Sequence, residues 1–174
     1  MNFNFKNRTA TILLNAVCFV CFLLFQLQLT AQNAIQVAGS PTKNAVQSGN
    51  WTAPSTWGGS LPNNNARVLI PANITVTVDN KIATEFKSVK IEGTLKFATN
   101  KDTELRTEYI VSTMMGKLEI GTANNPIPTN VKASLVFAEK GGTSQSEDPQ
   151  RFAPGAVLMG PTTMHGANKT SWLA

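Results

Sequence analysis

The chain has 174 residues, of which 15 are lysine or arginine and 10 are aspartate or glutamate, giving a formal net charge of +5. Two of the basic residues, Lys6 and Arg8, lie in a predicted leader; removing them from 15 leaves 13 basic against 10 acidic residues and a net charge of +3. This balance is too mild to predict a nucleic-acid-binding protein. About 140 residues remain after the leader, enough for one domain with a sizeable core.

Residues 1–31 have the organisation of a secretory signal peptide. Lys6 and Arg8 precede an apolar run over Ala10–Leu29, and small residues follow up to Ala31. A basic segment, an apolar segment and a small-residue exit are the three parts of such a leader. We therefore predict cleavage after Ala31. An uncleaved anchor helix is the alternative, because the run approaches the roughly 20 residues that span a bilayer, and this is the only membrane contact that we expect.

Both cysteines of the chain, Cys18 and Cys21, lie inside this leader. The chain that follows it therefore has no disulfide, although exported domains often use them. Its stability must come from the core and from hydrogen bonds alone.

The next segments contain turn and linker residues. We interpret residues 32–48, which are small and polar without periodicity, as a linker. Residues 50–65 are rich in Gly, Pro, Asn, Ser and Thr and predict a long loop. This loop contains Trp51 and Trp57, which we expect to plug the open end of a β-structure. The alternative role is stacking of their exposed ring faces on a sugar.

The regular patterns begin after this loop. In "RVLIPANITVTVD", residues 67–79, apolar β-branched residues alternate on both sides of a Pro-Ala-Asn break. This predicts strand, turn and strand. The unit recurs in "VKIEGTLKF", residues 89–97, and in "IVSTMMGKLEIGT", residues 110–122, where Gly93 and Gly116 mark equivalent turns 23 positions apart.

The rest of the chain repeats this pattern less clearly. Residues 131–142 and 155–166 look like further, degraded copies, and residues 102–111 are either a short helix or the approach to a strand. Repeats of about 20 residues with glycine corners predict an all-β fold of stacked short strands. We expect a right-handed parallel β-helix or its N-terminal capping portion. A β-sandwich is the alternative, although its hairpins more often contain Asn-Gly turns.

Taken together, these residues resemble the G8 domain, a module named for its glycines. The resemblance runs from Gly49 to Trp172, and its features are Trp51, Trp57 with Gly58, Pro62, the pair "VLIP…ITVTVD", "IEGTLKF", "GKLEIGT" and "HGANKTSW". We accordingly assign residues 49–174 to a G8 domain. The resemblance implies an extracellular, mostly β module at the head of larger proteins, such as the cell-migration-inducing hyaluronidase, a transmembrane hyaluronidase and fibrocystin.

In several of these proteins a pectin-lyase-like β-helix follows the G8 domain. The resemblance therefore implies a downstream β-helix as a partner, and we expect this chain to be a truncated product or a fragment, since it ends at "TSWLA". It also implies a secreted or cell-surface location. Catalysis would belong to the larger proteins, so we expect none from this chain alone; if it were active, it would be a polysaccharide hydrolase or lyase.

Several residues are candidates for binding. Lys87, Lys90 and Lys96 alternate around the second repeat and predict a basic edge for an acidic polysaccharide such as hyaluronan. His165, the single histidine, lies in a glycine turn. It would need a carboxylate or nucleophile within hydrogen-bond reach to act as a base, and a structural role in the turn is the simpler interpretation.

The carboxylates offer weaker candidates. Glycoside hydrolysis needs two carboxylates roughly 5–10 Å apart, and Glu92 and Glu119 lie beside equivalent turns, although solvated strand faces are the simpler interpretation. Asp79 closes a strand and is expected to cap the next turn.

A late loop offers a further candidate. Glu147, Asp148 and Arg151 occupy it and suggest a calcium ion or a charged sugar. The loop lacks the ligand spacing of a dedicated calcium site. A plain surface loop is therefore preferred, and no other cofactor is expected.

Two functions follow from these observations. The first is a secreted module that binds an extracellular polysaccharide or helps a β-helix partner to process it. The second is a non-catalytic structural or adhesive module that caps a β-helical stalk. A non-functional truncated fragment is a third possibility.

Overall fold

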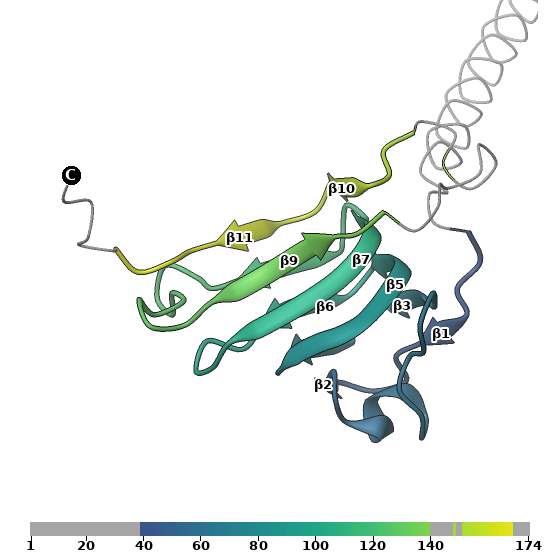
Figure 1. The fold of residues 1–174 in the computed structure, drawn as a ribbon, viewed down its shortest axis with the longest axis horizontal. Helices are drawn as coiled ribbons and strands as arrows, with labels where there is room; N and C mark the ends of the chain where they lie inside the picture. The colour runs from purple at the N-terminus through teal and green to yellow at the C-terminus, as the bar shows by residue number, and fades with distance from the viewer. Residues whose placement is uncertain (1–38, 140–147, 149–150, 169–174) are drawn as a thin grey trace, which may run out of the picture. The chain divides into compact units, whose positions relative to one another are not determined.

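The computed structural model describes residues 39–139, 148 and 151–168, and the predicted leader lies outside them. The described residues form a stack of β-coils, which Figure 1 follows from β1 and β2 at one end to β10 and β11 at the other. The short 3-10 helix η1 spans Pro54–Trp57. The strands are β1 (Lys43–Asn44), β2 (Gly49–Asn50), β3 (Arg67–Ile70), β4 (Thr75–Val78), β5 (Lys81–Ile91), β6 (Thr94–Phe97), β7 (Thr103–Ser112), β8 (Lys117–Ile120), β9 (Ala133–Phe137), β10 (Gly155–Leu158) and β11 (Thr162–Met164).

The strands alternate between two parallel sheets. One sheet has the order β1-β3-β5-β7-β10, with β9 also paired to β7, and the other has the order β11-β8-β6-β4-β2. Consecutive strands from β1 to β9 therefore belong to different sheets, whereas β9 and β10 share one sheet, and neighbouring coils pair through their strands. Every strand pair among the described residues is parallel. This confirms the predicted all-β, β-helix-like fold and excludes a sandwich of hairpins.

Apolar residues form columns through the stack. Val68 pairs with Val89, which pairs with Ile110, and all three are buried. A second column in the other sheet joins Val76, Leu95 and Leu118. Burying one such side chain stabilises a fold by about 1.5–3 kcal/mol. The alternating residues recognised in the sequence are therefore the core of the coils.

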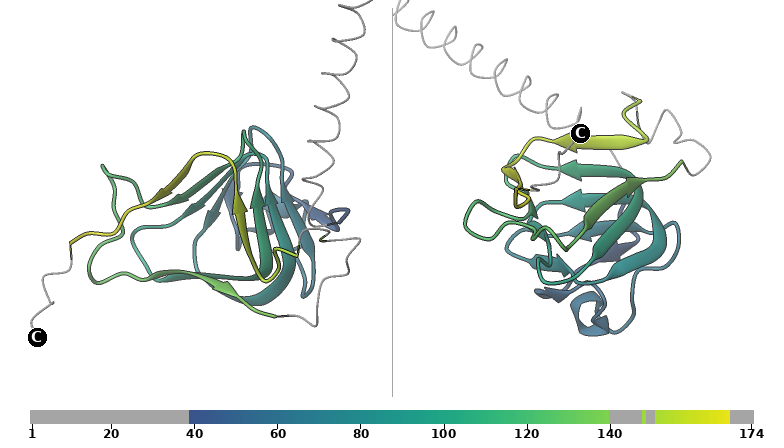
Figure 2. Two further views of the ribbon diagram at one scale, coloured as in Figure 1. Left: turned by 90° about the horizontal axis from the view of Figure 1, so that it is seen from above. Right: turned by 60° about the vertical axis from the view of Figure 1, so that its left-hand side comes forward.

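The long strands β5 and β7 each span two sides of a coil. The register continues from Phe86 and Thr107 to Ser88 and Tyr109, with Lys87 and Glu108 between them at the bend. The left-hand view of Figure 2 shows the resulting three-sided outline of the coils. Residues 102–111, for which a helix or a strand approach was predicted, thus lie almost entirely in a strand.

The last coil divides this long side into two strands. β9 pairs with residues 103–107 of β7, and β10 pairs with residues 109–112. The segments that we predicted as two separate degraded copies are therefore parts of one coil. Residues 138–154 connect them where the preceding coils have a single residue.

The corner glycines are required for space. A Cβ on Gly93 would overlap the carbonyl oxygens of Pro71 and Ile74, and one on Gly116 would overlap the carbonyl oxygen of Ile91. Neither glycine has a positive φ. Close stacking of the coils, and not an unusual backbone angle, is therefore the constraint that requires glycine at these corners.

The tryptophan loop covers the first coil. The ring centroids of Trp51 and Trp57 are 4.9 Å apart, and Trp51 also packs on Phe86. The indole N–H of Trp57 donates to the Trp51 carbonyl at 2.7 Å. Both carboxylate oxygens of Asp79 accept bonds from Thr52, so Asp79 anchors this loop rather than the turn after its own strand.

The ordered stack begins earlier than the sequence predicted. β1 lies at Lys43–Asn44, inside the segment 32–48 interpreted as a linker, and it pairs with β3. Short polar strands of two residues have no detectable alternation, which is why sequence patterns missed it.

Candidate functional site

A cavity of about 530 Å³ opens at the last coil of the stack. Its apolar lining includes Ile120, Ile127, Val131, Leu135, Phe137 and Met164. Lys132 and His165 add polar groups. This is the size and mainly apolar character of surfaces that hold a ligand or another polypeptide.

The strands of the last coil position this lining. Met164 of β11 pairs with Ile120 of β8, and Leu135 of β9 pairs with Leu105 of β7. Ile120 and Leu135 pack against the buried core. The cavity wall is thus the continuation of the core, and the paired strands expose it where the stack has no further coil among the described residues.

His165 lies at the edge of the cavity with an exposed side chain. Its backbone N–H donates to the Ile120 carbonyl at 2.9 Å, and its carbonyl accepts the Ile127 N–H at 2.8 Å. The backbone of His165 therefore joins the last coil to the segment that follows β8. Backbone groups provide these bonds, so a structural role of the His165 side chain stays a prediction.

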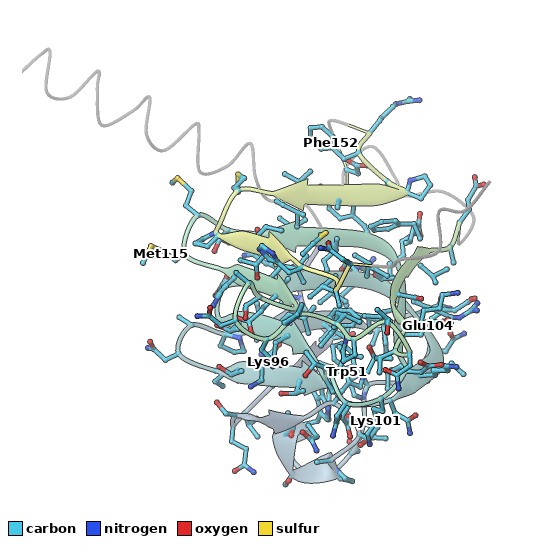
Figure 3. The ribbon with its side chains drawn as sticks, turned by 90° about the vertical axis from the view of Figure 1, so that its left-hand side faces the viewer. Trp51, Lys96, Lys101, Glu104, Met115 and Phe152 are labelled. Atoms are coloured by element: carbon cyan, nitrogen blue, oxygen red, sulfur yellow. The ribbon has the colours of Figure 1, made fainter. Side chains whose placement is uncertain are left out.

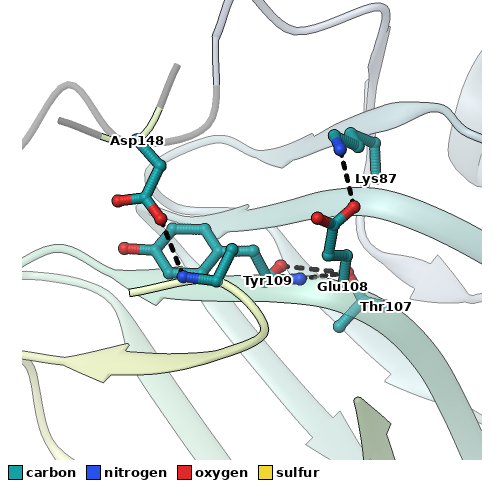
Figure 4. Close-up of polar contacts among 6 residues, drawn as sticks. Lys87, Thr107, Glu108, Tyr109 and Asp148 are labelled. Atoms are coloured by element: carbon teal, nitrogen blue, oxygen red, sulfur yellow. Dashed lines mark hydrogen bonds and ion pairs between the residues drawn. The ribbon is translucent and has the colours of Figure 1, made fainter. Parts of the chain in front are cut away.

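A second polar group occupies the bend of the long strands (Figure 4). Lys87 Nζ lies 2.6 Å from Glu108 Oε2, and the Glu108 side chain is 1% exposed. Tyr109, the next residue on β7, is buried, and so is Asp148 (Figure 4). Asp148 accepts a bond from the Ala153 N–H at 2.7 Å. Burial, and to a lesser extent the charge of Asp148, raises the pKa of the Tyr109 hydroxyl.

This cluster is enclosed rather than open. Within the described part of the chain, the Tyr109 hydroxyl and Asp148 Oδ1 are buried without a hydrogen-bond partner. Buried charges are tolerated when they are paired, which is the role of the contact between Lys87 and Glu108. The cluster therefore stabilises the bend. Its side chains are too deeply buried to contact a substrate in this structure.

The three lysines of the predicted basic edge do not lie together. Lys87 and Lys90 are on β5, and Lys96, which Figure 3 labels, is on β6 in the other sheet. Lys87 pairs with Glu108, and Lys90 Nζ lies 2.8 Å from Glu92 Oε1. The positive charges of Lys87 and Lys90 are therefore neutralised locally.

The two carboxylates considered for glycoside hydrolysis are also apart. The register places Glu119 beside Lys96, and Glu119 forms an ion pair with Lys117 at 2.7 Å. Glu92 lies in the corner after β5. The structure does not bring these two carboxylates together as an acid and base pair.

The remaining predicted residues have other positions. Trp51 and Trp57 are 2% and 1% exposed, so neither presents a ring face to a sugar. Arg151 is exposed, and Glu147 lies outside the described residues. The described residues contain no group of three or more histidines, cysteines, aspartates or glutamates arranged for a metal ion. Calcium binding stays a prediction.

Sequence reasoning missed the bend cluster and the cavity. Glu108 had a usable signal, because an acid directly before the apolar run of Tyr109, Ile110 and Val111 suggests a paired buried charge. The cavity had no such sequence signal, because the segments that line it do not share a repeating pattern of apolar residues.

No helix in the described ranges has the length and apolarity needed to cross a membrane. A search of curated proteins and a search of solved structures each returned no match. The family model described as "G8 domain" matches residues 56–174, which is more than half of the chain. The stacked coils, their glycine corners and this match agree, and the chain belongs to the G8 domain family.

Proposed function

We propose that this chain is an exported G8 module that closes one end of an extracellular β-helix and receives further coils at its other end. G8 domains occur in extracellular proteins, and residues 1–31 are the predicted secretion signal. The observation that carries the proposal is the difference between the two ends of the stack. One end is sealed by aromatic side chains and the other exposes an apolar cavity.

The sealed end is suited to face water. Trp51 and Trp57 cover the first coil, and Asp79 fixes their loop through two hydrogen bonds. Terminal caps of this kind are required for solubility in stacked repeats.

The other end has the features of an interface. Phe137 and Met164 are 39% and 56% exposed, and both line the cavity. The outer edges of β10 and β11 have no strand partner among the described residues. Unpaired edges and exposed apolar side chains favour association with another β-structure. A further parallel coil would pair with the strand edges and bury the apolar side chains at the same time.

The test adds a coil to the chain. A copy of Thr103–Ile120 is appended after Ala174, so that residues 165–174 serve as a connection of similar length to residues 121–132. Burial of the cavity by the added coil should raise Tm by several degrees. It should also reduce binding of a dye that fluoresces on apolar surfaces.

A matched control uses the same extension with its copies of Leu105, Ile110 and Leu118 changed to aspartate. This control has the same length and cannot bury apolar surface, so its Tm should equal that of the unextended chain. An unchanged Tm for the first extension would overturn the capping proposal.

A second candidate function is binding of a polysaccharide on the outer face of the second sheet. A polar row crosses this face, since Thr77 pairs with Lys96 and Lys96 with Glu119. Lys96 forms no ion pair with the described residues. A flat polar face with a free cation suits an extended acidic polymer such as hyaluronan.

This candidate is tested by retention of fluorescent hyaluronan, with and without calcium, on the chain beginning at Gln32. Lys96→Glu should abolish retention, and Lys90→Glu, a charge reversal in the other sheet, should preserve it. Equal retention by both variants would remove Lys96 from the site, and no retention by the parent chain would remove this candidate. Shortening of the polymer would show that the chain is an enzyme.

A further inference from the structure

The corner glycines form a column that continues to the exposed end of the stack. The register aligns Thr94 with Lys117, and Thr162 with Leu118. Counting back along each strand, the residues at the shared corner position are Ile74, Gly93, Gly116 and Gly160. Three successive coils therefore have glycine at one position of the corner.

Each glycine of this column has a carbonyl oxygen of the coil beneath it in the place of a side chain. A Cβ on Gly93 would overlap the Ile74 carbonyl oxygen, and a Cβ on Gly160 would overlap the carbonyl oxygen of Gly116. A Cβ on Gly116 would overlap the carbonyl oxygen of Ile91, at the end of β5 in the coil beneath. Backbone oxygens held in a ladder cannot move aside as a flexible side chain can. The carbonyl of one coil thus selects glycine in the next coil.

Between the earlier coils, the column also contributes hydrogen bonds, whereas Pro161, which follows Gly160, has no N–H to donate to the Gly116 carbonyl. The N–H of Thr94 donates to the Ile74 carbonyl, and the N–H of Lys117 donates to the Gly93 carbonyl, both at 2.8 Å. At the end of the column, the Gly160 carbonyl accepts only a long 3.3 Å bond from the Thr162 hydroxyl among the described residues. Gly160 is therefore prepared to accept a backbone N–H from an incoming coil.

We propose that this end of the stack selects its partner through that carbonyl. The partner is a parallel β-coil with glycine at the corner that lies over Gly160 and apolar residues that fill the cavity. The N–H after that glycine donates to the Gly160 carbonyl. This inference rests on the proposed capping function and specifies which coils the end accepts. A coil with any side chain at that corner is rejected by overlap with the oxygen.

The experiment uses the extension introduced above, which contains a copy of Gly116 at the required corner. Gly116→Val is made in the copy only, and Met115→Val in the copy is the matched control, because Met115 is 85% exposed in the parent chain. The unmodified extension and the Met115→Val extension should raise Tm equally. The Gly116→Val extension should lose most of that increase.

A second measurement tests the column inside the chain. Gly160→Val should speed amide exchange in β11 about tenfold or more, because its side chain meets the Gly116 carbonyl, and Met159→Val should not. Equal behaviour of the paired variants in both experiments would overturn the glycine rule while leaving the capping function supported. Failure of every extension to raise Tm would overturn the capping function and this inference with it.

Discussion

Glu108 carries its charge where only 1% of its side chain is exposed, and Lys87 supplies the opposite charge at 2.6 Å. Removing one partner of a buried ion pair is strongly destabilising, because the short charge-assisted contact is lost in a place with little water. Glu108→Leu should therefore reduce the free energy of unfolding by about 3 kcal/mol, measured by urea denaturation. The double variant Lys87→Met with Glu108→Leu should recover most of the loss. A small effect of the single variant would show that other contacts hold Lys87.

Tyr109 gives a direct measure of the enclosed cluster, because it is the only tyrosine in the chain. Burial raises the pKa of its hydroxyl above the ordinary value of about 10. Above that pH the unfolded chain gains by ionisation and the folded chain does not, so stability is lost as pH rises. Phenolate absorbance should appear only with unfolding, and Tyr109→Phe should weaken this alkaline loss of stability. Phenolate in the folded chain near pH 10 would contradict the burial.

The roles of some buried residues could be predicted from the sequence, and those of others could not. Val68, Val76 and Leu95 were recognisable from alternation, because a strand with one buried face has a period of two. The contact between Lys87 and Glu108 was not recognisable, although the position of Glu108 suggested a buried charge, since the period changes phase at the bend that they occupy. Pairing between distant segments places them together, and composition carries no signal for that pairing.

Among the elements, the tryptophan loop allows the clearest test of its role in stability. Trp51 packs on Trp57 and Phe86 and is almost fully buried. Trp51→Ala should cost about 3–5 kcal/mol of stability, measured by urea denaturation. Leu61→Ala, which removes a 47% exposed side chain from the same loop, is the control and should have little effect. Similar losses for both would show that the loop does not seal the first coil.

The short strands and the corners between them could be predicted from the sequence. The long sides of the coils, formed by β5, β7 and the pair β9 and β10, could not. Pro-Ala-Asn and the two glycines marked the corners between β3 and β4, β5 and β6, and β7 and β8. The division of the last coil into β9 and β10 was missed, because an insertion at a bend separates two halves of one side. Local patterns describe neighbours in the chain, whereas coil membership depends on what pairs in space.

At the scale of the molecule, a stack of coils should be least stable where it has one neighbour instead of two. β5 and β7 each have a strand on both sides, whereas β10 and β11 pair on one side among the described residues. Amides of β10 and β11 should therefore exchange about tenfold faster than those of β5 and β7. Hydrogen exchange followed by mass spectrometry measures this gradient. Uniform protection would show that the stack opens as one cooperative unit.

The bend of the long side has a consequence for how such proteins diversify. One residue separates the paired halves of β5 and of β7 at this bend, and in the last coil the stretch 138–154 lies between β9 and β10 in the sequence, yet β9 and β10 keep their parallel register with β7. Sequence length at this position is thus independent of the rise of the stack. New peptide can be inserted there, by evolution or by grafting, without disturbing the coils that carry it.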